Sequence, residues 1–393
     1  MRELNVVLLT NFIPPYRLPL FRDIGAQFGS FRVLQSITMS PERPWTAEHS
    51  GLQVETQRTI TLRAHWSHPY GFRDRLSIHI PYDTLGRLHR LKPDVVISAE
   101  IGFRTAQAAA HRLLHPRSRL IIWAAISEHT EEGRDFSRRV LRRILMPSAD
   151  AVIVNGASGA NYVRRFGVAS EKIFIAPYTT DGCLFSALSL TRSAAERRRL
   201  LYVGQLVKRK GLFALLSALS RWCKAHSNAE VELWLVGDGP ERAYLERTEL
   251  PPNLVLRFCG NVGFENLPNF YKQAGILAFP TLSDEWGVVV NEAMAAGMPV
   301  LGSIYSQAVE ELVKDGVTGW TFRPNQSDEM YIALERALTT PSEALEQMGV
   351  AARKAVEHLT PRFGTNRIMD AIRFVSGKGR GEDTAMVCET IKR

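Results

Sequence analysis

Residues 280–300 read PTLSDEWGVVVNEAMAAGMPV, and this stretch indicates the fold. It follows a short apolar run, 276–279, that suits a buried strand, and it ends in good helix formers capped by Gly297. A helix N-terminus carries partial positive charge and N–H groups that suit a phosphate. Glu292 lies about one turn beyond Val288, where its carboxylate can accept hydrogen bonds from two neighbouring hydroxyls, as on a ribose. This strand–loop–helix unit therefore predicts a nucleotide site.

Length and composition predict a globular protein with two domains. The chain has 393 residues, too many for one ordinary core, with 45% hydrophobic and 23% charged residues. Its apolar runs are shorter than the roughly 20 residues of a membrane span, and its first residues do not resemble an export signal. We therefore expect a cytoplasmic protein. The cysteines show no CxxC spacing and are expected to be reduced thiols: Cys183, Cys223, Cys259 and Cys388.

The net charge of +9 is confined to one half of the chain. Residues 1–180 contain 24 Lys and Arg against 15 Asp and Glu, whereas residues 181–393 contain 25 of each sign. Such asymmetry predicts an anionic partner for the first half, either membrane headgroups or a phosphate-bearing acceptor. Nucleic acid is the least favoured partner because no recognised binding module occurs.

Apolar strand-like runs alternate with helical segments twice along the chain. This pattern predicts an α/β protein with two Rossmann-like, doubly wound domains that face a central cleft, where ligands bind at the carboxyl ends of the strands. The stretch from about residue 40 to 82 is irregular in polarity. The expected division is a first domain at 1–180, a linker at 181–199, a second domain at 200–360, a helix at 361–376 that packs back on the first domain, and a poorly ordered tail at 377–393.

The segment 203–211, VGQLVKRKG, follows the first strand of the second domain. Lys210 stands just before the next helix, where a lysine can neutralise a diphosphate as a point charge. The segment is not a P-loop, because GxxxxGK[ST] is missing. The alternative is a solvated basic turn formed with Lys208 and Arg209.

Four motifs in the second domain resemble a known family. In order they are VGQLVKRKG, LVGDGPE, FCGNVGFENLPNFYKQAGILAFPTLSDEWGVVVNEAMAAGMPVL and ELVKDGVTGWTFRP. Together they are similar to the C-terminal domain of glycosyltransferase family 4. The resemblance covers about residues 200–325, and it extends more weakly over the first domain through NFIPPYRLPLF and ADAVIVNGASGANYV. It implies the GT-B fold and transfer of a sugar from a nucleotide donor with retention at the anomeric carbon.

The resemblance also implies roles for residues of the second domain. Glu292 matches the second position of the family's Glu-x7-Glu motif and would bind the ribose hydroxyls. Asp284 takes the first position, where the family's carboxylate contacts the donor sugar, and an aspartate there also suits a helix N-cap. Family members often carry two cations at the diphosphate. Lys210 matches one of them, and Gln205 stands where the other, an arginine, is often found. The helix start at Gly287, Val288 and Val289 is expected to supply more of the stabilisation.

Three residues of the first domain are further candidates, His129 for catalysis together with Lys210, Asp284 and Glu292, and Glu128 and Arg17 for binding the acceptor. His129 follows the strand at 120–125, in a loop where many family members keep a functional histidine, and the alternative is a structural histidine. Glu128 precedes it and is a candidate acceptor contact. Arg17, in PPYR, stands at the mouth of the first strand and is a candidate for an acceptor phosphate or, alternatively, an exposed turn residue.

The segment 135–146, DFSRRVLRRILM, predicts a basic amphipathic helix. Phe136, Val140 and Ile144 share one face, and the four arginines lie largely opposite: Arg138, Arg139, Arg142 and Arg143. Such a helix can lie on an anionic membrane. The alternative is a helix whose apolar face packs on its own sheet and whose arginines are solvated.

These observations predict a retaining glycosyltransferase, cytoplasmic and peripheral at the inner membrane face, that moves a sugar from a nucleoside-diphosphate donor to a glycan or lipid-linked saccharide in polysaccharide synthesis. No cofactor or metal is expected, because no Asp-x-Asp occurs to hold a metal on the diphosphate. The alternatives are a sugar-nucleotide epimerase of the same fold and a non-catalytic sugar-nucleotide-binding subunit. A dehydrogenase is disfavoured by the absence of GxGxxG after either opening strand.

Overall fold

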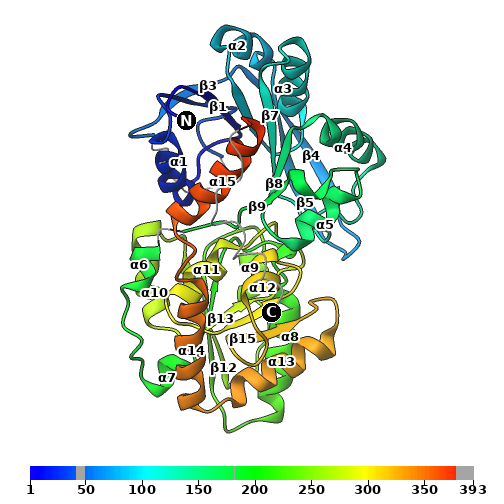
Figure 1. The fold of residues 1–393 in the computed structure, drawn as a ribbon. Coiled ribbons are helices and arrows are strands. Elements are labelled where there is room, and N and C mark those ends of the chain that lie inside the picture. Colours follow the sequence, from blue (N-terminus) through cyan, green and yellow to red (C-terminus); the bar gives the residue numbers. More distant parts are fainter. Residues whose placement is uncertain (41–48, 181, 378–393) are drawn as a thin grey trace.

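A seven-stranded parallel sheet organises the first domain of the computed structural model, which describes residues 1–40, 49–180 and 182–377 (Figure 1). The strand order is β3-β2-β1-β6-β7-β8-β9. The strands are β1 (Asn5–Thr10), β2 (Ser30–Gln35), β3 (Gln53–Thr56), β6 (Val95–Ala99), β7 (Arg119–Ala124), β8 (Ala151–Val154) and β9 (Ile173–Ile175). The central strands are almost continuously apolar because helices cover both faces of the sheet.

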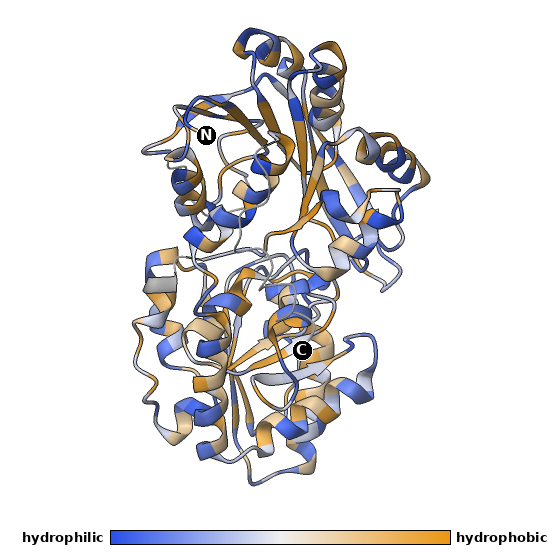
Figure 2. Ribbon diagram, in the orientation of Figure 1, coloured by the Kyte–Doolittle hydropathy of each residue, from blue (hydrophilic) through white to orange (hydrophobic). Residues whose placement is uncertain are grey.

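The helices of the first domain fill the connections between these strands. They are η1 (Pro15–Arg17), α1 (Leu18–Gly25), α2 (Thr84–Leu91), α3 (Phe103–Leu114), α4 (Phe136–Ser148), α5 (Ala157–Arg164) and η2 (Ser170–Lys172). Figure 2 shows mostly hydrophobic strands inside the domain and, around them, helices that contain both hydrophilic and hydrophobic residues.

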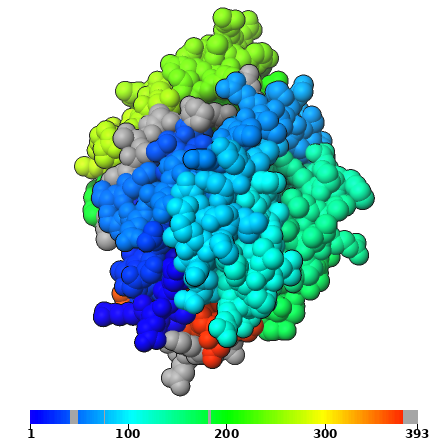
Figure 3. Space-filling model, turned by 90° about the horizontal axis from the view of Figure 1, so that it is seen from above, coloured from blue at the N-terminus to red at the C-terminus, as the bar shows by residue number. Residues whose placement is uncertain are grey.

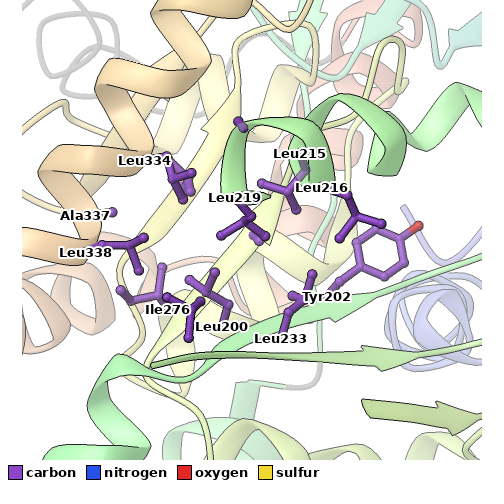
Figure 4. Packing of buried hydrophobic residues seen from close by; sticks show 14 of the residues in the cluster. Leu200, Tyr202, Leu215, Leu216, Leu219, Leu233, Ile276, Leu334, Ala337 and Leu338 are labelled. Atoms are coloured by element: carbon purple, nitrogen blue, oxygen red, sulfur yellow. The ribbon is translucent and has the colours of Figure 1, made fainter. Parts of the chain in front are cut away.

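The second domain contains a six-stranded parallel sheet in the order β12-β11-β10-β13-β14-β15. Its strands are β10 (Leu200–Val203), β11 (Val231–Val236), β12 (Leu254–Gly260), β13 (Ile276–Phe279), β14 (Val300–Ser303) and β15 (Gly319–Phe322). Its helices are η3 (Lys208–Lys210), α8 (Leu212–Ala225), α9 (Arg242–Glu246), η4 (Phe264–Asn266), α10 (Leu267–Lys272), α11 (Val288–Ala295), α12 (Gln307–Leu312), α13 (Ser327–Thr339) and α14 (Ser342–Val356). Leucines of α8 and α13 meet over the strands in Figure 4. The predicted pair of Rossmann-like domains is confirmed.

The strand order reverses once in each sheet. In the first domain the reversal lies between β1 and β6, and in the second it lies between β10 and β13. The loops that leave two such strands diverge to opposite faces of the sheet and open a crevice between them. The reversal point of each sheet is therefore where a ligand is expected to bind.

The chain crosses the domain boundary twice. Helix α15 (Pro361–Val375) returns to the first domain, where it packs beside α1 and buries Ile368 and Ile372 in that domain's core (Figure 1). The stretch expected as a linker contains α6 (Gly182–Ser186) and α7 (Ala194–Arg198). Phe185 of α6 is buried in the second domain, and the buried Arg192 donates hydrogen bonds to backbone carbonyls there. This stretch is therefore part of the second domain's packing.

The irregular structure expected for residues 40–82 is wrong over most of that range. Besides β3, residues 59–81 form a long antiparallel hairpin, β4 (Thr59–Ser67) and β5 (Arg73–Pro81), which pairs only with itself among the described strands. Its sequence lacks the regular alternation of apolar and polar residues that predicts a strand, because both faces of the hairpin mix the two kinds. Residues 41–48 and the tail from 378 onward, for which poor order was expected, lie outside the described residues.

Candidate functional site

Two loops of the second domain bring Lys210 and Asp284 together. Lys210 ends η3 after β10, Asp284 follows β13, and the Lys210 ammonium forms an ion pair with the Asp284 carboxylate. Both side chains are mostly buried. The Lys210 ammonium also lies 5.3 Å from the ring centre of Phe279. The structure thus joins two predicted site residues that are 74 positions apart in the sequence.

The backbone around this ion pair is tightly constrained. Gly211 has a φ of +70°, and a Cβ there would lie 2.0 Å from the carbonyl oxygen of Pro280, so only glycine fits. The N–H of Leu282 donates to the carbonyl of Arg209 at 2.8 Å. The loops after β10 and β13 are therefore held as one unit at the point where the strand order reverses.

Gly287 begins α11 in a conformation that other residues rarely adopt. Its φ is +101°, and a Cβ would lie 2.7 Å from the ring of Phe279. The chain turns sharply at Gly287. The first N–H groups of α11, those of Val288 and Val289, therefore follow directly after the loop that contains Asp284. Such N–H groups have no partner within the helix and favour an anion.

The electrostatics of Asp284 favour its charged form. Burial opposes ionisation, but the positive charges of Lys210 and Arg209 outweigh it and lower the pKa of Asp284 below its ordinary value. Gln205, at the end of β10, is partly buried, and its carbonyl accepts a hydrogen bond from the Tyr202 hydroxyl at 2.6 Å. Gln205 thus stands beside the same crevice without bringing a charge.

Glu292 is almost fully buried behind the start of α11. Its side chain accepts a hydrogen bond from the Tyr271 hydroxyl at 2.7 Å, and the residue is 3% exposed. Burial raises the pKa of Glu292 to about 7, although the hydrogen bond from Tyr271 works in the opposite direction. A buried carboxylate without a cationic partner is costly, which is typical of a residue kept for binding rather than for stability.

Glu285 faces the first domain across the cleft. The residue is exposed to solvent, and desolvation by the surrounding protein together with the charges of Glu100 and Asp284 raises the pKa of Glu285 to about 7. Its carbonyl accepts a hydrogen bond from the Gln307 side chain at 2.6 Å. Gln307 also donates to the carbonyl of Ile126 in the first domain at 2.9 Å, so the two domains are bonded beside the site.

On the first domain, Arg17 lies at the same cleft. Its guanidinium stacks on the rings of Trp123 and Tyr178, 4.7 and 4.3 Å from the ring centres. Burial alone would lower its pKa, but nearby Tyr178, Tyr16, Glu285 and Glu100 raise the pKa of Arg17. The arginine is therefore a fixed cation that lies near Glu285 of the loop after β13.

Three further residues gather at the reversal point of the first sheet, and sequence reasoning missed them. The Asn11 amide after β1 donates to the Glu100 carboxylate after β6, and Arg104 of α3 donates to the Asn11 side-chain oxygen. Glu100 has a left-handed φ of +69°, a strained conformation for this residue. Arg104 is 5% exposed, and one of its terminal nitrogens has no hydrogen-bond partner. Backbone strain and a buried guanidinium nitrogen without a hydrogen-bond partner among the described residues are both typical of a binding position, and neither is visible in the sequence.

His129 stacks on a residue of the opposite domain. Its ring lies 4.2 Å from that of Tyr305, and the hairpin residue Tyr70 lies 5.0 Å from Tyr305, so the three rings from two domains adjoin. Burial lowers the pKa of His129, which keeps the ring neutral at neutral pH. Sequence reasoning missed Tyr305 because its partners come from distant segments.

Glu128 lies at the edge of this boundary. It forms an ion pair with Arg165 and, with His129 and Arg139 of α4, lines a cavity of about 530 Å³. The predicted site residues thus fall into two groups. One group lies in the second domain, in the loops after β10 and β13 and in α11: Gln205, Lys210, Asp284, Gly287, Val288, Val289 and Glu292. The other group lies on the first domain: Arg17, Glu128 and His129.

Within the described residues, no group of three or more His, Cys, Asp or Glu side chains is arranged to hold a metal ion. None of the helices in that part of the chain combines the length and apolar character that crossing a membrane requires.

Two Rossmann-like domains, with the loops after β10 and β13 of the second domain facing the first, define the GT-B class of fold. A solved structure with this fold is HepE from Anabaena in complex with UDP and glucose, which superposes with a TM-score of 0.67 at 18% identity and covers 94% of this chain and 99% of that one. Residues 191–355 match the family model described as glycosyl transferases group 1. The second domain is therefore similar to the group 1 glycosyl transferases, and the resemblance seen in the sequence is confirmed.

Two relatives support the same assignment at lower coverage. The sulfoquinovosyl transferase of Arabidopsis thaliana is 26% identical over 325 residues, which are 76% of this chain and 60% of the relative. A Campylobacter jejuni alpha-1,4-N-acetyl-D-galactosaminyltransferase, whose name includes a PP-undecaprenol-linked saccharide, is 28% identical over 197 residues, 49% of this chain and 52% of the relative. The chain therefore spans less than two thirds of either relative's length.

Proposed function

We propose that the protein is a retaining glycosyltransferase that moves a sugar from a nucleoside-diphosphate sugar to a hydroxyl of a glycan or lipid-linked saccharide. The observation that carries this proposal is the ion pair of Lys210 with Asp284, directly before the start of α11 and its buried Glu292, in a domain that matches the group 1 family model. HepE, of the same fold, was solved with UDP and glucose, which supports a nucleotide-sugar donor. The epimerase and the non-catalytic subunit are less favoured by these comparisons.

The proposed roles follow from the charges. Lys210 and the N–H groups of Val288 and Val289 would neutralise the departing diphosphate, and Glu292 would hold the ribose hydroxyls. Asp284, beside Lys210, would contact the donor sugar, where a carboxylate stabilises developing positive charge. We further propose that the β-phosphate of the leaving group takes the acceptor proton and that no metal is needed, because lysine and helix start already supply positive charge at the diphosphate.

The acceptor would bind on the first domain. Arg17 and the group formed by Asn11, Glu100 and Arg104 lie opposite the donor loops, and Glu100 lies close enough to Glu285 to raise its pKa. An amide, a carboxylate and a guanidinium together can bind several hydroxyls of one sugar. His129 would contribute from the side of the cleft, next to Tyr305.

A donor screen tests this function. Each common nucleoside-diphosphate sugar is added to the protein, and the donor should raise the melting temperature while others leave it unchanged. The stabilising donor is then incubated with lipid-linked or free saccharides, and transfer should depend on the added acceptor. Turnover of donor to an isomer without acceptor would favour the epimerase, and binding without transfer to any acceptor would favour the non-catalytic subunit.

We also propose that α4 binds an anionic membrane. Its apolar residues Phe136, Val140 and Ile144 are 75%, 39% and 64% exposed, which overturns the alternative that this face packs on the sheet. Leu145 and Met146 of the same helix do pack inward. Helices α3 and α4 adjoin, and the cyan and green residues that include them cover neighbouring parts of the outer surface in Figure 3.

One of the four arginines that were expected on the solvated face of α4 is buried instead. Arg142 is buried and pairs with the buried Glu131, so it does not belong to the solvated face expected from the sequence. Arg139 and Arg143 remain exposed beside the apolar stripe. An exposed apolar stripe bordered by arginines is complementary to anionic headgroups above acyl chains. The PP-undecaprenol in the name of the Campylobacter jejuni relative supports a lipid-linked acceptor at such a surface.

Vesicle co-sedimentation tests the membrane proposal. The wild-type protein should bind vesicles that contain anionic lipid, and binding should weaken as salt rises, because screening acts on exposed charges. Replacing Phe136, Val140 and Ile144 together with serine should reduce binding at least tenfold, since each buried apolar side chain contributes roughly 1.5–3 kcal/mol. Replacing three comparably exposed residues of the second domain, Val255, Ile332 and Val350, should not. Equal binding to neutral vesicles would contradict the proposal.

A further inference from the structure

Arg209 lies in the same turn as Lys210 but bonds to the other domain. Its Nε donates to the Asp74 carboxylate of β5 at 2.6 Å, and one of its terminal nitrogens donates to the carbonyl of Ser283 at 2.8 Å. The ion pair joins positions 135 residues apart and crosses the boundary between the domains. Arg209 is therefore held by the donor loop on one side and by the hairpin on the other.

The hairpin that carries Asp74 is firmly seated. Trp66 and Phe72 near its tip are buried, and the Arg134 guanidinium lies 3.6 Å from the ring centre of Trp66. Beyond them, Tyr70 stacks on Tyr305 of the second domain. Asp74 thus stands on a rigid arm of the first domain that touches the second domain at two places, which makes it suitable for fixing the orientation of a guanidinium.

Arg209 lies close enough to Lys210 and Asp284 to act on an anion that binds there. Lys210 forms an ion pair with Asp284, and Arg209 donates to the carbonyl of the preceding residue, Ser283, at 2.8 Å, so the two cations flank one position of this loop. Both also lower the pKa of Asp284. A nucleoside diphosphate carries more than one negative charge, and Gln205 contributes none. An anionic group that reaches Lys210 would also come under the influence of Arg209, whose planar fork suits phosphate oxygens.

We propose that Arg209 is the second cation of the donor diphosphate site and that Asp74 of the opposite domain positions it. The inference rests on the proposed function and adds a residue to it. Because Asp74 belongs to the first domain, the diphosphate site is complete only when the two domains are closed on each other. Arg209 thereby replaces, from another position, the charge that Gln205 lacks.

Binding of a nucleoside diphosphate and the matching monophosphate tests the role of Arg209. UDP and UMP are titrated by calorimetry into the wild-type protein, or GDP and GMP if UDP does not bind. Arg209→Gln should weaken diphosphate binding about tenfold or more while changing monophosphate binding by less than about threefold, because a charge-assisted bond to the second phosphate is lost. Arg209→Lys keeps the charge and should retain part of the preference for the diphosphate.

Two further variants distinguish the cation from a simple link between the domains. Asp74→Asn should reduce the preference for the diphosphate in the same direction, and adding it to Arg209→Gln should cause no further loss, because Asp74 acts through Arg209. Lys208→Gln removes a charge from the exposed neighbour in the same turn and should change nothing. All variants are first checked for a wild-type melting temperature within a few degrees.

The outcomes separate this inference from the proposed function. If Arg209→Gln weakens diphosphate and monophosphate equally, or weakens neither, Arg209 only joins the domains and the inference is overturned while the donor site stands. If the wild-type protein binds none of the common nucleoside diphosphates, the donor site itself is overturned, and the inference with it.

Discussion

Replacing Lys210 with alanine is expected to reduce sugar transfer about a hundredfold or more, which is the scale seen when one preorganised charge at a developing anion is removed. The reason is that Lys210 is fixed beside Asp284 in a loop that cannot rearrange, since Gly211 lies against the carbonyl of Pro280. Water would then have to solvate the departing diphosphate in a crevice closed by the other domain. Single-turnover kinetics with saturating acceptor measure the effect.

A second variant separates this loss from damage to the fold. Lys210→Ala leaves the mostly buried Asp284 with Arg209 as its nearby cation, and some stability is lost for that reason. Lys210→Ala combined with Asp284→Asn removes the unbalanced carboxylate and should recover the melting temperature but not the activity. Transfer at the wild-type rate in either variant, at subsaturating donor, would remove Lys210 from the proposed site.

Glu292→Gln should reduce transfer at least tenfold through weaker donor binding. A carboxylate accepts two hydroxyl hydrogen bonds, whereas the amide that replaces it offers one acceptor and a donor that faces the same hydroxyls. The wild-type protein should therefore discriminate between UDP and 2′-deoxy-UDP, and the variant should discriminate much less. Calorimetric titration with both nucleotides measures this, and an unchanged ratio would show that Glu292 does not hold the ribose.

The same variant should be more stable than the wild-type protein above neutral pH. The pKa of Glu292 is about 7 in the folded protein against an ordinary value of 4.5, so the folded state keeps a proton that the unfolded chain has released. Its contribution to the free energy of unfolding is therefore greatest below pH 4.5, declines as pH rises to 7 and stays low above it, by about 3 kcal/mol at most. Glutamine has no such dependence. Urea unfolding at pH 5 and pH 8 without nucleotide should show the wild-type protein losing more stability than the variant.

The sequence was most informative where structure is local. The apolar runs at 200–203, 231–236 and 276–279 coincide with β10, β11 and β13, and residues 361–375 coincide with α15. Strands buried on both faces and helices with clear ends produce such runs directly. The hairpin β4–β5 was missed because it pairs only with itself within the described sheet structure and alternates imperfectly, so that its register depends on contacts at its tip.

The site was predicted in parts for the same reason. Asp284, Gly287 and Glu292 lie in one strand–loop–helix unit, so their proximity follows from the sequence. The ion pair of Arg209 with Asp74 and the stack of Tyr305 on His129 join segments of different domains. The spacing of residues along the sequence does not predict such contacts. The buried position of Arg142 also could not be predicted, because its partner Glu131 lies outside the helix whose periodicity placed it.

The return of α15 to the first domain gives the chain a nested topology. The second domain begins and ends against the first domain, at residues near 180 and near 360, so it is in effect an insertion within the first domain. A body attached by two adjacent connections can rock about the line between them but resists twisting. The natural unit for exchanging donor specificity between relatives is therefore this inserted cassette, with α15 left in the recipient.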